Sequence, residues 1–138
     1  MVTFFVFFGC INVLAAQDSW KLVHNGKVVL ESKVEDPEKN SFPIRIPSFN
    51  KAGLLAVVYT EVPKQKDWKR TMIIVDENDN ELLRKEGRTV NIQNQELRSL
   101  FKKAKAIEVY TMSLPADPKK AALVRVRRVH LATITLTQ

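Results

Sequence analysis

The chain has 138 residues, a formal net charge of +7 and 45% hydrophobic residues, a composition ordinary for a globular domain. Its one cysteine, Cys10, lies within the first sixteen residues, so the remainder has no disulfide, cysteine nucleophile or thiolate metal site. The four glycines form no phosphate-binding loop, which excludes nucleotide sites of that kind.

Residues 1–16 carry no charged side chain, and thirteen of them are apolar. The run ends in small residues before the polar Gln17–Ser19, an arrangement typical of a secretory signal peptide. It is shorter than the roughly 20 residues that a transmembrane helix needs. We therefore predict a signal peptide over 1–16, one domain over 17–138, and a periplasmic or secreted location. The alternative is a lipid anchor on Cys10, which follows a small residue as in bacterial lipoproteins.

The first predicted element of the domain is a β-hairpin around Asn25-Gly26. Both residues accept the positive φ of a type I′ turn, and the apolar runs Trp20–His24 and Lys27–Glu31 flank them. The expected cross-strand pairs are Leu22 with Val29, Val23 with Val28, and His24 with Lys27.

Further strands are expected along the rest of the chain from their β-branched and alternating residues. They are Phe42–Pro47 at a sheet edge, Gly53–Val62 at a sheet centre, a hairpin of Thr71–Val75 and Glu81–Lys85, then Ala106–Met112 and the long segment Ala121–Leu136. Leu114–Pro118 is expected to be a rigid turn into this last strand.

One helix is predicted between these strands. Asn94 is its expected N-cap and Glu96 lies in its first turn, while Lys102, Lys103 and Lys105 lie in its last turn, where the helix dipole favours cations. Its apolar face consists of Leu97, Leu100, Phe101 and Ala104.

About eight short strands and one short helix predict a mainly β fold, an antiparallel β-sandwich. A partly open β-barrel is the alternative.

The alternation within Ala121–Leu136 places Arg125 and Arg127 on one face of the predicted strand. The phase then slips near Arg127–Arg128 and again near Leu131–Ala132, which predicts a bulge or bend at each place. The arginines form either the solvated face of the strand or a row of guanidinium groups about 7 Å apart.

The excess of positive charge belongs to the second half of the chain. Residues 18–63 contain six basic and six acidic side chains, whereas residues from 64 onward contain sixteen basic and nine acidic ones. Such a field attracts anionic partners. The candidate ligand-binding residues are Arg125, Arg127, Arg128, Lys69, Arg70 and Trp68. For Trp68 the alternative is a core residue that opens the next strand.

Catalytic and metal-binding motifs are sparse. His24 and His130 are far apart in the sequence, and no serine lies in a nucleophile-elbow motif. The segment Asp76–Glu81 resembles the start of a calcium loop, but its sixth position is Glu81 and its twelfth is Gly87, so we expect a polar turn. No metal and no cofactor is predicted.

The sequence thus suggests a non-enzymatic, exported β-sandwich that binds an anionic component of the cell envelope or an acidic protein through its basic half. Peripheral membrane contact fits this hypothesis, whereas the exported location and the lack of a recognition motif disfavour nucleic acid. One alternative is a structural or assembly protein with sheet-edge contacts to a partner. Another is a small hydrolase that uses His24 or His130 with a carboxylate.

Overall fold

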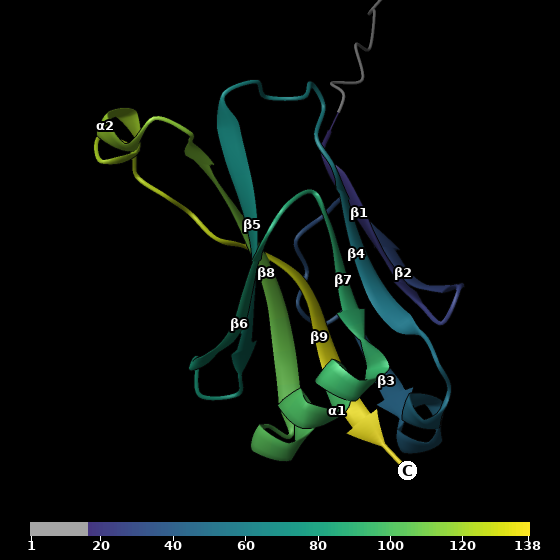
Figure 1. Ribbon diagram of the computed structural model, residues 1–138. Coiled ribbons are helices and arrows are strands. Elements are labelled where there is room, and N and C mark those ends of the chain that lie inside the picture. Colours follow the sequence, from purple (N-terminus) through teal and green to yellow (C-terminus); the bar gives the residue numbers. More distant parts are fainter. Residues whose placement is uncertain (1–16) are drawn as a thin grey trace, which may run out of the picture.

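The computed structural model describes residues 17–138 (Figure 1), so the predicted signal peptide and Cys10 lie outside the described residues. Nine strands form two sheets. The four-stranded sheet has the order β2–β1–β4–β7 and consists of β1 (Ser19–His24), β2 (Lys27–Ser32), β4 (Leu54–Thr60) and β7 (Thr89–Gln93).

The five-stranded sheet has the order β3–β9–β8–β5–β6. Its strands are β3 (Ser41–Arg45), β5 (Trp68–Asp76), β6 (Glu81–Glu86), β8 (Ala106–Pro115) and β9 (Val129–Thr137). The helical elements are the 3-10 helix η1 (Ile46–Asn50), α1 (Asn94–Lys103) and the single turn α2 (Pro118–Ala121). Neighbouring strands are antiparallel except β3 and β9, which are parallel. The predicted β-sandwich is confirmed, and the sheets do not close into a barrel.

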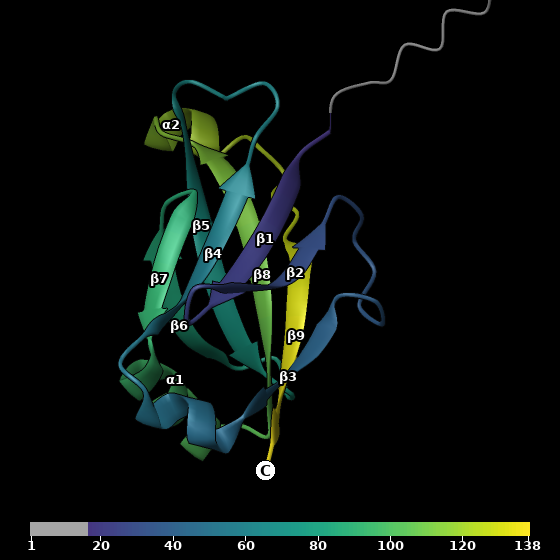
Figure 2. The same cartoon turned by 90° about the vertical axis from the view of Figure 1, so that its right-hand side faces the viewer.

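The two sheets enclose one hydrophobic core, viewed from the side of the four-stranded sheet in Figure 2. Fully buried side chains come from alternate positions of facing strands, as the strand period of two requires. Leu22, Leu55 and Ile92 belong to one sheet, and Ile107 and Ile134 to the other.

The sandwich is closed differently at its two ends. At one end, α1 inserts Leu97 and Leu100 into the core and packs near η1, whose Phe49 is buried. At the other end, no helix of residues 17–138 inserts side chains into the core. Instead the buried charged pair Glu61 and Arg70 spans the two sheets there.

The hairpin of β1 and β2 is confirmed, with positive φ angles at Asn25 and Gly26. His24 pairs with Lys27 and Val23 with Val28, as expected. The third expected pair is wrong, because a register shift between Leu22 and Val23 makes Leu22 face Leu30 instead of Val29. Val29 is the extra residue and forms a β-bulge in β2, the edge strand of this sheet.

Asn94 begins α1 but is not its N-cap. Gln93 occupies the cap position without a side-chain hydrogen bond, and the Asn94 side chain points into the protein. Its amide donates to Asn25 Oδ1 and to the Lys51 carbonyl, each at 2.9 Å. Its oxygen lies 2.9 Å from His24 Nε2. Asn94 thus joins the first hairpin, the loop after η1 and the helix.

The largest error concerns the predicted strand Ala121–Leu136. Only its second half is a strand, β9, while residues before Val129 form the end of α2 and an irregular segment. The reason is the lack of a partner strand: β8 pairs with β9 only up to Thr111, opposite Val129, and beyond this point β8 pairs with β5 alone. The first predicted bend therefore marks the start of the strand.

The second predicted bend is confirmed as a β-bulge. Val109 pairs with Ala132 and the next residue, Tyr110, pairs with His130, so Leu131 is the extra residue on β9. His130, Leu131 and Ala132 are consequently all buried in succession.

Candidate functional site

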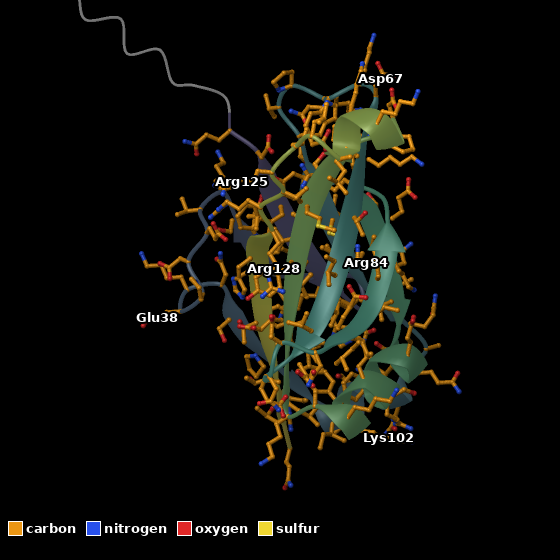
Figure 3. All side chains as sticks on the ribbon, turned by 90° about the vertical axis from the view of Figure 1, so that its left-hand side faces the viewer. Glu38, Asp67, Arg84, Lys102, Arg125 and Arg128 are labelled. Atoms are coloured by element: carbon orange, nitrogen blue, oxygen red, sulfur yellow. The ribbon has the colours of Figure 1, made fainter. Side chains whose placement is uncertain are left out.

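The end of the sandwich opposite α1 is formed by two segments, residues 62–69 and 115–127, which we call the basic tip. The first segment connects β4 to β5, and the second leaves β8, forms α2 and turns back toward β9. The backbone N–H of Ala116 donates to the Asp67 carbonyl at 2.7 Å and joins the two. Figure 3 shows Asp67 beside α2 at this end, with Lys102 at the opposite end.

Local sequence explains why α2 forms here. Asp117 is its N-cap, and its carboxylate accepts a hydrogen bond from the Lys119 backbone N–H at 3.0 Å. Pro118 at the first helical position has the φ angle that a helix start requires. The turn buries none of its own residues, so it projects from the sandwich (Figure 1).

The basic tip concentrates the charge of the chain. It contains seven basic and two acidic side chains, a net charge of +5 out of the total of +7. Five exposed cations of the tip make no ion pair within residues 17–138; they are Lys64, Lys66, Lys119, Lys120 and Arg125.

A groove of about 520 Å³ lies between the two segments of the tip. Trp68 and Val124 are among its apolar lining residues, and its charged lining residues are two lysines and two aspartates: Lys66, Lys120, Asp67 and Asp117. Trp68 opens β5, as one of the two sequence hypotheses expected, but it is only half-buried and is not part of the hydrophobic core.

The predicted row of arginines does not exist, because Arg125, Arg127 and Arg128 lie in the irregular segment before β9. Arg127 pairs with Glu35 and Arg128 with Asp79, so the two point to carboxylates of different loops. The Arg128 guanidinium also lies 4.1 Å from the centre of the Tyr110 ring. Figure 3 accordingly shows Arg128 at the middle of the five-stranded sheet and Arg125 closer to the end that carries Asp67 and α2.

The remaining two candidates differ in exposure. Lys69 is exposed and lies 3.9 Å from Glu86, a pair that water screens. Arg70 is buried, and its Nε donates to Glu61 Oε1 at 2.8 Å while another guanidinium nitrogen donates to Thr111 Oγ1 at 3.1 Å. Its charge is thus neutralised inside the protein and is not presented at the surface.

Glu61 is the centre of a buried network beneath the tip. It accepts hydrogen bonds from Arg70 and from Arg88, whose Nε lies 2.9 Å from Oε2, and from the Gln65 backbone N–H at 3.3 Å. Burial alone would raise the pKa of Glu61, but the hydrogen bonds from Arg70 and Arg88 outweigh it and lower this pKa below the usual value of 4.5. The carboxylate therefore holds the loop of the tip against the sandwich.

Tyr59 and Asp18 extend this network. The Tyr59 hydroxyl donates to Asp18 Oδ2 at 2.8 Å, and the other oxygen of Asp18 accepts from the Val62 backbone N–H at 2.8 Å. The Tyr59 ring stacks on Trp20 and lies under the Arg70 guanidinium, 3.9 Å from the ring centre. Burial, together with the hydrogen bond to Asp18, raises the pKa of Tyr59 to about 12.

The two histidines lie apart, and both are buried. His24 is bonded to Asn94 on the α1 side of the molecule. His130 Nε2 lies 2.8 Å from Thr133 Oγ1 and 3.9 Å from Glu108 Oε1, and burial lowers the pKa of His130. Neither histidine lines the four best-formed grooves among residues 17–138.

The calcium-like segment is a polar turn, as expected. The Asp76 carboxylate accepts from the backbone N–H groups of Asn78 and Asn80 and from the Asn80 side chain. These bonds, the side-chain bond from Asn80 first, lower the pKa of Asp76. In the part of the chain that the structure covers, no three metal-ligating side chains gather and no helix is long and apolar enough to cross a bilayer.

No family model matches this chain, and neither does any curated protein or solved structure. The case for its function therefore rests on the geometry above.

Several features of the tip were missed by sequence reasoning. The dipeptide Asp117-Pro118 combines a preferred N-cap with a preferred first helical residue, which was a usable signal for α2. This signal places a helical turn over the residues up to Ala121, and so argues against a strand that begins at Ala121. The approach of the two segments of the tip had no local signal, because it depends on the pairing of β5 with β8.

Proposed function

We propose that this protein is an exported, non-enzymatic β-sandwich that binds an anionic surface or an acidic partner through the basic tip. One observation carries the proposal: the tip presents five exposed cations without ion-pair partners, and two of them, Lys66 and Lys120, line a groove that contains Trp68. Such a surface attracts anions over a distance of about 10 Å at moderate salt and offers an aromatic contact at short range.

The opposite end also carries exposed lysines, but these have another explanation. Lys102 and Lys103 lie in the last turn of α1, where they complement the helix dipole. The tip has no comparable reason for its charge, since Lys64 and Lys66 are in a loop and α2 is a single turn.

Charge reversal at the two ends tests the proposal with a matched control. The tip variant carries Lys→Glu at positions 64, 66, 119 and 120, and the control carries Lys→Glu at positions 51, 102, 103 and 105. All eight side chains are exposed, and both variants have the same net charge. Binding to immobilised dextran sulfate and to vesicles with phosphatidylglycerol is measured at low and at high salt.

We expect the tip variant to bind at least about 100-fold more weakly at low salt, since each basic side chain near an anionic surface contributes about 1 kcal/mol. The control should stay within about tenfold of the wild type, because its changed charges lie beyond the screening length. Equal losses in both variants, or no binding by the wild type, would contradict the proposal.

The alternative of an assembly protein has one observation in its favour. β2 is an outer strand whose Val28 side chain is 49% exposed, and no described strand pairs with its outer side. An exposed strand edge is able to accept a strand of another chain. Co-purification with one stoichiometric partner, unchanged at high salt and abolished by Val29→Pro rather than by the tip variant, would favour this function.

A further inference from the structure

The basic tip also exposes apolar side chains. Seven large hydrophobic residues are exposed among residues 17–138, and four of these belong to the tip: Val62, Leu123, Val124 and Val126. Leu123 is 88% exposed, more than any other of the seven. The tip therefore combines five cations that make no ion pair with four of the seven exposed large hydrophobic residues of the part of the chain that the structure describes.

Folding does not require this exposure. Backbone hydrogen bonds fix the turn that carries Leu123: its N–H donates to the Lys120 carbonyl at 3.1 Å, and the N–H of Ala122 donates to Pro118 at 3.1 Å. Because the Leu123 side chain is almost fully exposed, its replacement by serine would leave no cavity in the protein. The Leu123 side chain thus contributes little to the stability of the fold and is available for a contact outside it.

The chemistry of the tip fits one kind of anionic partner best. Lys119 and Lys120 precede Leu123 with two alanines between them, and Arg125 lies between Val124 and Val126. Cations interleaved with aliphatic side chains suit an interface where a negatively charged layer covers an apolar one. A soluble polyanion has no apolar layer, and a projecting single turn presents little of the flat area that a stable protein contact buries.

Resting on the proposed function, we infer that the anionic partner is a lipid bilayer with acidic headgroups. The lysines and Arg125 contact the headgroup phosphates, and Leu123 with its valine neighbours enters the acyl region. Trp68, half-buried in the adjacent groove, lies near the level of the headgroups, where tryptophan is enriched in membrane proteins.

The test uses the full chain, so that residues 1–16 are the same in every sample. Leu123→Ser is compared with Val28→Ser, which changes an exposed side chain of β2 away from the tip. Binding is measured by sedimentation with vesicles of phosphatidylcholine containing 30% phosphatidylglycerol, and separately on dextran sulfate. A polarity-sensitive dye on Leu123→Cys, in a chain with Cys10→Ser, reports the surroundings of position 123.

We expect Leu123→Ser to bind the vesicles about tenfold more weakly, from the loss of one buried aliphatic side chain. Its binding to dextran sulfate should be unchanged, and Val28→Ser should behave as the wild type with both probes. The dye should shift to shorter wavelength with the vesicles and not with dextran sulfate.

The outcomes separate the two proposals. If Leu123→Ser binds the vesicles as the wild type does and the dye does not shift, bilayer insertion is wrong, while the charge-reversal result still decides the proposed function. If the dye shifts with dextran sulfate as much as with the vesicles, it does not report entry into an acyl region, and the bilayer is likewise rejected while the basic tip remains an anion-binding surface. If neither vesicles nor dextran sulfate binds, both proposals fail.

Discussion

The buried carboxylate of Glu61 makes the strongest prediction about stability. Its side chain is 3% exposed and that of Arg70 is 8% exposed, so each is the main counter-charge of the other. Replacing Glu61 with glutamine leaves the Arg70 charge buried without a carboxylate, a change that costs about 3–5 kcal/mol in other proteins. Because Arg88 is 41% exposed and can turn to water, we expect the lower end of this range, about 3 kcal/mol.

The free energy of unfolding is measured with guanidinium chloride, followed by tryptophan fluorescence. Trp20 is a suitable probe, because it is buried, stacks on Tyr59 and donates to the Leu131 carbonyl at 2.9 Å. A loss of 3 kcal/mol corresponds to a fall of about 12 °C in Tm for a domain of this size.

Glu81→Gln is the matched control. Glu81 pairs with Arg84 at 2.6 Å, a distance as short as that of the buried pair, but both side chains are nearly half exposed. It should change the free energy of unfolding by less than about 1 kcal/mol. If Glu61→Gln costs no more than Glu81→Gln, burial does not determine the strength of this network and the reasoning fails.

The same variant predicts a pH dependence. The folded protein lowers the pKa of Glu61, so the stability from its charge is fully present above the usual value of 4.5 and is lost as the pH falls through the lowered value. The difference in stability between wild type and Glu61→Gln should therefore shrink in acid. A double variant, Glu61→Gln with Arg70→Met, should recover at least half of the loss, since no buried charge remains unpaired.

Three further predictions concern other buried groups. Asn94→Ala should lower the free energy of unfolding by about 2 kcal/mol, because it removes the hydrogen bonds to His24, Asn25 and the Lys51 carbonyl. The loss is measured by chemical denaturation, and a value below about 0.5 kcal/mol would contradict this reasoning. Gly53→Ala should cost about 1–3 kcal/mol, since a Cβ there would lie 2.2 Å from Asn25 Oδ1, which is held by Asn94; a variant as stable as the wild type would contradict this. In Tyr110→Phe the one remaining tyrosine is Tyr59, whose pKa should be about 12 in the folded protein and near 10 in urea. Because folding raises this pKa, the free energy of unfolding should fall as the pH rises above 10. A midpoint near 10 for the folded protein, measured by absorbance at 295 nm, would exclude the burial of the Tyr59 hydroxyl.

The hairpin at Asn25-Gly26 was predictable because its cause is local. Both residues tolerate positive φ, and the structure has them at 50° and 82°. The bulge that moves Leu22 opposite Leu30 was not predictable, since nothing in either strand alone marks where the extra residue is placed. A sequence pattern specifies that strands pair, whereas the register depends on packing across the sheet.

The candidate site shows the same limit more severely. The alternation of valine and arginine before Val129 does not distinguish a strand from an irregular segment without a partner strand. What decides the outcome is that β8 is paired with β9 only as far as Thr111. The association of Glu61 with Arg70 likewise depends on two strands of different sheets, β4 and β5, ending and beginning at the same place.

The parallel pairing of β3 with β9 bears on the order in which the chain can fold. Ser41 pairs with Thr133, and Trp20 donates to the Leu131 carbonyl across 111 positions of sequence. Residues near the beginning of the domain therefore contact residues of β9, which are synthesised last. A chain emerging from the ribosome cannot complete the β3–β9 pair or the Trp20 bond between the sheets until β9 has been synthesised. Topologies dominated by such distant contacts fold slowly. The β3–β9 pairing and the Trp20 hydrogen bond are therefore among the last native contacts that the chain can form during its synthesis.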